Sequence, residues 1–339
     1  MSSAVRDIKL IVAIVLAVLA LVSGCAGRPE EQPGRPARPT APARPAAHPQ
    51  AGTPAGPAVG GDGSYRVGQR QVTFTEPAHT APAGQYAGQR TLVTQIWFPL
   101  ASGPAGPFPL LMFAPGFLQC AGAYSGLLRA WASAGYVVAA INFPRTNCHL
   151  GTGAYEPDLV NQPQDMSYVL SRLLDLSAQP RSAFSGLLDP HEVGAAGQSD
   201  GGDTVAALAA NTCCTDRRLR AVAVLSGAEW PPMPGRYFPG REPPMLFTQG
   251  SADTINPPWT SMQLYRADDD GARYYLDLFG ASHLVPYEGT NPVERLVARV
   301  TLAFFDRYVL GQSGALETMT RDGNLSGAAA LVSGGQPPP

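Results

Sequence analysis

The chain has 339 residues, of which 37 are Gly and 34 are Pro, and 45% are hydrophobic. Its 24 basic and 26 acidic side chains give a formal charge of −2, which argues against non-specific electrostatic binding of nucleic acid. The apolar content is sufficient for a sizeable core, and the length fits one large domain or two small ones.

Residues 1–24 have the pattern of an export signal. Arg6 and Lys9 precede an unbroken apolar run over 10–22, which at 13 residues is shorter than the about 20 that a membrane-spanning helix needs. The run ends just before Cys25, in a segment that resembles the lipobox of bacterial lipoproteins, where cleavage leaves the cysteine to carry the lipid. The resemblance implies a lipid anchor on Cys25 at the outer face of a bacterial membrane. An ordinary secretory signal is the alternative.

Composition divides the rest of the chain into a linker, a domain and a tail. Residues 25–64 are rich in Pro, Ala and Gly and contain almost no large apolar side chain, which predicts an extended, disordered spacer. Residues 313–339 are similarly poor in core residues, so we expect a flexible C-terminal tail there. The remaining segment, 65–312, has the length of one α/β domain.

Within this domain, short runs of β-branched and apolar residues alternate with longer amphipathic segments. Such alternation predicts an α/β fold, with a mostly parallel central sheet and helices on both of its faces. In sheets of this kind the reacting groups lie at the carboxyl ends of the strands. The expected strands are 92–98, 108–114, 136–143, 193–197, 221–226, 245–249 and 274–279, and the expected helices are 121–134, 158–177, 202–210, 257–267 and 292–309.

A G-x-S-x-G motif at 197–201 follows one expected strand and leads directly into a helix. This is the setting of a nucleophile elbow, in which the glycines permit a tight turn that exposes the serine Oγ. Ser199 is therefore the candidate nucleophile. Asp253 and His283 each follow a later strand, in the chain order serine, acid, histidine. We expect His283 to act as the general base and Asp253 to orient it.

Acyl transfer also needs backbone N–H donors for the oxyanion that develops on the carbonyl. One donor should be the amide of Asp200, which follows the nucleophile. The other should come from the loop after the strand 108–114, where Gly116 permits a close approach and Phe117 supplies the amide. The Phe117 ring is then expected to line the substrate cleft.

Five segments in chain order carry a resemblance to one family. They are A-P-G-F at 114–117, W-A-S-A-G-Y-V-V at 131–138, the G-x-S-x-G motif, D-T-I-N-P at 253–257 and G-A-S-H at 280–283. Together they resemble the cutinase-like polyester hydrolases of the α/β-hydrolase superfamily, with the dienelactone-hydrolase and platelet-activating-factor-acetylhydrolase branches further off. The resemblance covers 90–310. It implies a metal-independent hydrolase of carboxylic esters, in which Ser199, Asp253 and His283 are catalytic and Phe117 and Asp200 supply the oxyanion donors.

Three positions depart from the pattern of that family. Gln198 and Asp200 flank the serine where family members commonly have His and Met. A carboxylate at Asp200 adds negative charge near the site unless it turns away or pairs, which argues against anionic substrates. Trp230 lies near the place of a family tryptophan that clamps the acyl part, and we expect it either to bind substrate or to serve in packing.

Besides Cys25, the chain has four cysteines, which allow three pairings. An exported protein meets oxidising conditions, so disulfides are permitted. Cys120 and Cys148 follow strands that are neighbours in the hydrolase sheet, and we favour a bridge between them that would rigidify the oxyanion loop. The adjacent Cys213 and Cys214 fit either a strained vicinal bridge or two free thiols. No spacing of Cys and His resembles a zinc site.

The sequence therefore predicts a membrane-tethered serine esterase that acts on a small or polymeric ester, as a monomer and without metal or cofactor. One alternative is a surface binding lipoprotein whose hydrolase site is disabled by Gln198 and Asp200. Another is an acyltransferase or deacetylase that uses the same three catalytic residues. Nucleic-acid binding is not expected.

Overall fold

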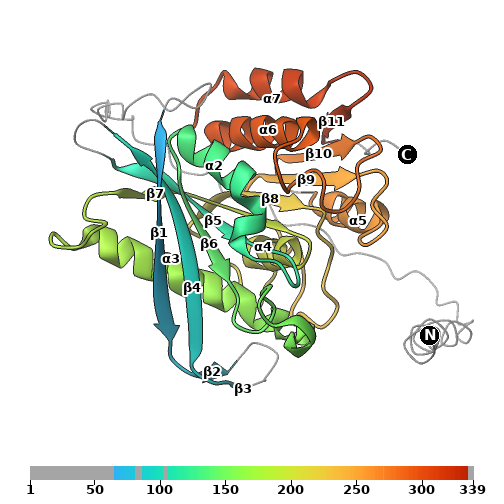
Figure 1. Ribbon diagram of the computed structural model, residues 1–339. Helices are drawn as coiled ribbons and strands as arrows, with labels where there is room; N and C mark the ends of the chain where they lie inside the picture. The colour runs from blue at the N-terminus through green and yellow to red at the C-terminus, as the bar shows by residue number, and fades with distance from the viewer. Residues whose placement is uncertain (1–64, 81–85, 102–105, 270, 335–339) are drawn as a thin grey trace, which may run out of the picture. The chain divides into compact units, whose positions relative to one another are not determined.

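A nine-stranded sheet forms the centre of the protein (Figure 1). The computed structural model describes residues 65–80, 86–101, 106–269 and 271–334. A separate small pair joins β2 (His79–Thr80) to β3 (Tyr86–Ala87). The strands of the large sheet are β1 (Arg66–Glu76), β4 (Arg90–Leu100), β5 (Phe108–Ala114), β6 (Val137–Asn142), β7 (Leu188–Gln198), β8 (Leu219–Leu225), β9 (Met245–Gly250), β10 (Arg273–Leu278) and β11 (Ala329–Ser333).

The strands follow the order β1-β4-β6-β5-β7-β8-β9-β10-β11 across the large sheet. From β6 to β10 each strand pairs in parallel with its neighbour, whereas β1 with β4, β4 with β6, and β10 with β11 pair antiparallel. Because parallel strands end at the same edge of a sheet, the loops that follow β5, β7, β9 and β10 meet there.

Helices cover both faces of the sheet (Figure 1). In β5, Leu111 and Phe113 point into one hydrophobic core, and Leu110 and Met112 point into the other. Both faces of the central strands are therefore buried, which confirms the α/β fold expected from the sequence. The helices α2 (Ser125–Ser133), α6 (Pro292–Tyr308) and α7 (Ala315–Gly323) contribute to the first core, and α3 (Gln162–Ala178), α4 (Asp200–Ala210) and α5 (Trp259–Ala267) to the second.

A buried ion-pair network joins the start of β4 to the segment around the start of α3. Arg90 donates from Nη2 to Asp158 Oδ2 over 2.7 Å and from Nε to Asp165 Oδ1 over 2.6 Å. Burial opposes the charge on Arg90, but hydrogen bonds and attraction from the two carboxylates hold the pKa of its guanidinium above the usual value. The network ties the 3-10 helix η3 (Glu156–Asn161) to the sheet, and removal of Arg90 would leave two buried acidic side chains without their cation.

The elements that the sequence analysis did not find lie mainly at the two edges of the sheet. Every expected strand is present, and every expected helix overlaps an observed one. The strand β1 was missed because its side chains are mostly exposed, so that it has no apolar run to mark it. Its place in the sheet depends instead on antiparallel pairing with β4 along its whole length.

The expected flexible tail from residue 313 is wrong for the part of it that the structure describes. Ala315–Gly323 forms α7, and Ala329–Ser333 forms β11, which extends the sheet next to β10. Met319 of α7 is fully buried against the first core. The segment has few large apolar residues, but backbone pairing with β10, which composition does not report, holds it in place. The folded domain thus continues past residue 312.

The expected signal peptide at 1–24, the lipid-bearing Cys25 and the linker 25–64 lie outside the described residues. In the part of the chain that the structure describes, no helix has both the length and the apolar character needed to cross a membrane.

Candidate active site

Ser199 lies in the tight turn between β7 and α4. Its backbone adopts φ 55° and ψ −125°, a region that residues other than glycine rarely occupy. A Cβ on Gly197 would overlap the carbonyl of Gly201, and a Cβ on Gly201 would overlap the carbonyl of Ala114 in β5. Both motif glycines are therefore required by close backbone contact. The turn has the geometry of a nucleophile elbow, and Ser199 is half-buried.

Ser199, His283 and Asp253 form a continuous hydrogen-bonded chain. Ser199 Oγ lies 2.8 Å from His283 Nε2, and His283 Nδ1 lies 2.7 Å from Asp253 Oδ2. Asp253 follows β9 and His283 follows β10, so the ends of three parallel strands supply the three groups. The imidazole and the carboxylate are buried, whereas the serine is half-buried. The chain of hydrogen bonds thus runs from the interior toward the surface, with the hydroxyl at its outer end.

Asp253 is held as a carboxylate by several donors. Its Oδ1 accepts from the backbone N–H groups of Ile255 at 2.9 Å and Asn256 at 3.0 Å, and its Oδ2 accepts from Gln249 Nε2 at 2.9 Å. Burial alone would raise the pKa of Asp253, but the hydrogen bond and charge of His283 and the two backbone donors bring it below the usual value. Gln249 was not predicted from the sequence, although a polar residue near the end of a buried strand was the available signal.

The expected oxyanion donors lie close to the serine. Among the described residues, neither the N–H of Phe117 nor that of Asp200 donates a hydrogen bond to another residue. Asp200 is the first residue of α4, so its N–H belongs to the unpaired donors of a helix N-terminus. A Cβ on Gly116 would lie 3.0 Å from Ser199 Cβ, which shows how closely the loop after β5 approaches the elbow. Phe117 is half-buried in this loop.

Gln198 links the loop after β5 to the loop that carries His283. Its Oε1 accepts from the hydroxyl of Tyr124 at 2.8 Å, and the same hydroxyl oxygen accepts from the N–H of Gly116 at 3.1 Å. Its Nε2 donates to the backbone carbonyl of His283 at 3.2 Å and lies 3.3 Å from His283 Nε2. Burial raises the pKa of Tyr124, which keeps its hydroxyl protonated as a donor. The glutamine is therefore integrated into the site, and the role of Tyr124 was not evident from sequence.

Asp200 neither turns to solvent nor forms an ion pair among the described residues. Its side chain is 8% exposed, and its Oδ2 is buried without a hydrogen-bond partner there. Burial and the negative charge of Glu156 raise the pKa of Asp200 to about 7, whereas His283 and the backbone N–H of Asp200 itself act in the opposite direction. At neutral pH the carboxyl therefore titrates next to Ser199.

Trp230 packs in a small hydrophobic cluster. The cluster joins it to the buried residues Leu159, Ala207 and Met233. Trp230 also lines a pocket of about 320 Å³, to which Ser199, Asp253 and His283 do not contribute. These contacts favour the packing alternative of the sequence analysis over a place in the substrate cleft.

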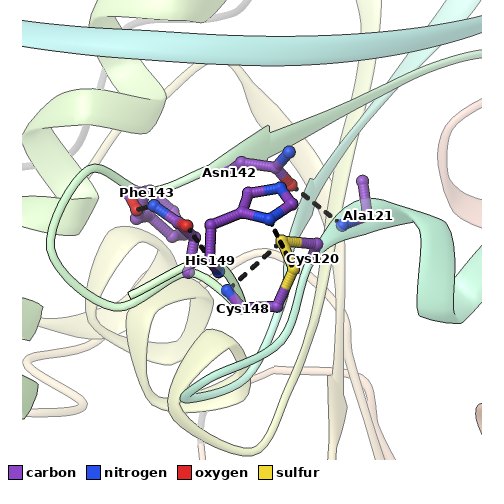
Figure 2. Close-up of a disulfide and its surroundings, with 7 residues drawn as sticks. Cys120, Ala121, Asn142, Phe143, Cys148 and His149 are labelled. Carbon is purple, nitrogen blue, oxygen red and sulfur yellow. Dashed lines mark hydrogen bonds between the residues drawn. A yellow bond between two sulfur atoms is a disulfide. The ribbon is translucent and has the colours of Figure 1, made fainter. Parts of the chain in front are cut away.

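The sulfur of Cys120 is bonded to that of Cys148, and the two Cα atoms are 5.3 Å apart (Figure 2). This bridge is the pairing favoured from the sequence, and it is confirmed. It joins the loop after β5 to the loop after β6, and so restrains the segment that carries Phe117. A second disulfide joins the adjacent Cys213 and Cys214.

His149 lies beside the first disulfide, with Nδ1 3.8 Å from Cys148 Sγ (Figure 2). With Cys120 it completes the one group of three potential metal ligands found among the described residues. Both sulfur atoms of this group are bonded to each other, so they do not offer the thiolates that a metal ion of this ligand class requires.

A comparison with known protein families matches residues 62–315 to the PET hydrolase-like family. A search of curated proteins found no match. The matched segment contains every parallel strand of the sheet, the elbow at Ser199 and the loops that carry Asp253 and His283. This match and the arrangement of the sheet show that the chain belongs to the PET hydrolase-like family of α/β-hydrolases and is a serine hydrolase that acts on esters.

Proposed function

We propose that the protein hydrolyses carboxylic esters through an acyl-enzyme on Ser199. The observation that carries the proposal is the unbroken hydrogen-bonded chain from Ser199 Oγ to His283 Nε2 at 2.8 Å, and from His283 Nδ1 to Asp253 Oδ2 at 2.7 Å. Distances of this size allow direct proton transfer between the hydroxyl and the imidazole. A carboxylate on the other ring nitrogen selects the tautomer that leaves Nε2 free to accept.

In the proposed reaction, Ser199 Oγ attacks the ester carbonyl while its proton passes to His283 Nε2. Asp253 stabilises the imidazolium, and the amides of Phe117 and Asp200 donate to the oxyanion of the tetrahedral intermediate. The intermediate collapses as His283 gives its proton to the departing alcohol oxygen, which leaves an acyl group on the serine. Water then attacks the acyl carbonyl, gives a proton to His283, and releases the acid as Ser199 regains its proton.

The surroundings of the three residues favour a hydrophobic ester, including a polymeric one. Exposed apolar side chains lie close in the chain to three of the site residues: Leu118 next to Phe117, Ile255 two residues after Asp253, and Val285 two residues after His283. Ile255 is 64% exposed and Val285 is 48% exposed. Exposed apolar side chains so close in the chain to the reacting groups favour an apolar ligand. They suit the acyl or alcohol part of a polyester as well as that of a small ester.

Labelling with a fluorophosphonate tests this function. The probe phosphonylates a serine hydroxyl quickly only when a base activates it. We expect Ser199 to gain one phosphonyl group as fluoride leaves, so that the peptide that contains it increases in mass by the probe less HF, and the activity on p-nitrophenyl butyrate to fall to the same extent. An unlabelled Ser199 in protein of native circular dichroism would favour the binding lipoprotein considered from the sequence.

We further propose that the domain is tethered to the outer face of a bacterial membrane by lipid on Cys25. Support comes from the sequence of the first 25 residues, with basic residues, a short apolar run and a lipobox-like end. Several acyl chains on one cysteine would give firm attachment, since each buried methylene contributes about 0.8 kcal/mol. The Pro-rich segment 26–64 would then act as a spacer between membrane and domain.

Replacement of the lipid-bearing residue tests the anchor. We expect Cys25→Ser to move the protein from the membrane fraction to the soluble exported fraction, because no thiol remains to carry the acyl chains. Fractionation of cells, followed by detection of the domain and its ester hydrolysis, measures the change. The spacer variant Ser64→Ala serves as the matched control and should stay in the membrane fraction. Membrane retention of Cys25→Ser after a carbonate wash would contradict the proposal.

A further inference from the structure

A buried carboxyl lies directly beside the proposed nucleophile. Asp200 follows Ser199 in the chain, and its backbone N–H is one of the two proposed oxyanion donors. Its side chain is 8% exposed, and among the described residues its Oδ2 has no hydrogen-bond partner. A buried polar atom without a partner is uncommon in a native fold and calls for an explanation.

The charged groups around Asp200 do little to compensate a negative charge there. Glu156 on η3 and Asp203 on α4 are themselves acidic, and each interacts electrostatically with the Asp200 carboxyl. Tyr124 of the 3-10 helix Ala121–Tyr124 (η1) has a pKa raised by burial and by the negative charges of Glu288 and Asp200, so it stays neutral and offers no positive charge. The favourable influences on an ionised Asp200 are His283 and the backbone N–H of Asp200 itself, and both are needed by the reaction.

We propose that Asp200 makes the site selective for uncharged and cationic esters, and against esters that carry a negative charge close to the scissile carbonyl. The inference rests on the proposed ester hydrolysis at Ser199 and assigns the charge class of its substrate. No arginine or lysine of the described residues forms an ion pair with Asp200, so none of these cations neutralises a negative charge beside Ser199.

The physical reason is Coulomb repulsion in a poorly solvated site. A unit charge several ångströms from an ionised Asp200, at the effective dielectric of a partly buried site, changes relative rates on the order of tenfold. An anionic substrate pays this penalty, and a cationic substrate gains a comparable attraction. Because the pKa of Asp200 is raised to about 7, the carboxyl is mostly neutral well below pH 7 and mostly ionised well above it. The selectivity should therefore develop as the pH rises through this range.

Three p-nitrophenyl esters of equal chain length test the proposal. They are the hexanoate, the monoester of adipic acid, which is anionic, and the 6-(trimethylammonio)hexanoate, which is cationic. For the wild-type protein we expect the ratio of kcat/KM for the neutral ester to that for the anionic ester to rise on the order of tenfold between pH 5.5 and pH 8.5. The preference for the cationic ester over the neutral one should rise over the same range.

Asp200→Asn removes the charge while it keeps the size of the side chain. We expect both ratios to become nearly independent of pH in this variant. Asp175→Asn is the matched control, because it removes one negative charge from a side chain on α3 that is 57% exposed and pairs with Arg172. This control should keep the pH dependence of the wild type. If Asp200→Asn retained the same change in the ratios with pH, the proposal would be wrong.

A second variant covers the case in which Asp200→Asn does not fold. Glu156 is exposed, and its charge raises the pKa of Asp200. Glu156→Gln should therefore move the midpoint of the change in selectivity to lower pH, and an unchanged midpoint would count against the proposal. The outcomes distinguish a failure of the proposed ester hydrolysis from a failure of the proposed role of Asp200. Absence of turnover of all three esters by the wild type would overturn the proposed function, whereas turnover without charge selectivity would overturn only the role of Asp200.

Discussion

Ser199→Ala is expected to lower kcat/KM for p-nitrophenyl butyrate by about 10⁴-fold or more. The alanine removes the atom that would form the acyl-enzyme, while the amides of Phe117 and Asp200 still polarise a bound carbonyl. A small residual rate should therefore remain above that of the uncatalysed reaction. The substitution should add no backbone strain, because Ser199 already has a positive φ and alanine has the same Cβ.

Steady-state kinetics and mass spectrometry measure this effect together. The variant should show neither an initial burst of p-nitrophenol nor labelling by a fluorophosphonate. Ser133→Ala is a matched control, because its hydroxyl bonds to the backbone carbonyl of Ala130 in α2, remote from the loops of the site in the chain. That variant should keep wild-type turnover. Undiminished ester hydrolysis by Ser199→Ala would refute the assignment of the nucleophile.

Asp253→Asn is expected to lower kcat by about 10⁴-fold, although it changes a single atom of the side chain. The backbone N–H groups of Ile255 and Asn256 hold Oδ1, so the new amide nitrogen must take the place of Oδ2. There it would donate toward His283 Nδ1 and select the tautomer with the proton on Nε2. That nitrogen could then no longer accept the proton of Ser199. The same NH₂ group would also face the Nε2 donor of Gln249.

The pH dependence of the variant distinguishes this cause from a general loss of structure. The pKa of Asp253 is below the usual value, so the wild-type protein should keep an ionised Asp253 throughout the working pH range. In Asp253→Asn the rate should be low at neutral pH and should recover in part in strongly alkaline solution, where hydroxide can replace the base. Circular dichroism and the midpoint of thermal unfolding check the fold. An activity within tenfold of the wild type would show that Asp253 does not orient the base.

Much of the fold was predictable because its central part obeys simple periodic patterns. Strands such as β5 and β6 are buried on both faces and consist almost entirely of apolar residues in the sequence. The edge strands β1 and β11 were missed for the opposite reason. Their side chains are largely exposed or partly buried, and backbone hydrogen bonds to β4 and β10 decide their place. Hydrogen bonding between backbones leaves little trace in composition.

The environment of the site was less predictable than its members. Gln198 bonds to Tyr124, which is 74 positions away in the chain, and to the backbone of His283, 85 positions away. From sequence the glutamine was a departure from a family pattern, and it supported the alternative of a disabled site. In the structure it joins the loop after β5, through Tyr124, to the loop that carries His283, so the departure no longer argues against a functional arrangement.

By itself, the sequence determined the alternation of the central strands and helices, and the position of the elbow at Ser199. It also identified Asp253 and His283, which each follow a later strand, as the candidate acid and base. Each of these depends on local features: apolar periodicity, glycine spacing and the position of a polar residue after a strand. Only the tertiary structure decided that Asp200 Oδ2 is buried without a hydrogen-bond partner among the described residues, that Trp230 packs against Leu159, Ala207 and Met233, and that the chain beyond 312 adds a strand to the sheet. The reason is that burial and hydrogen-bond satisfaction depend on segments far apart in the chain, which meet only when the sheet has formed.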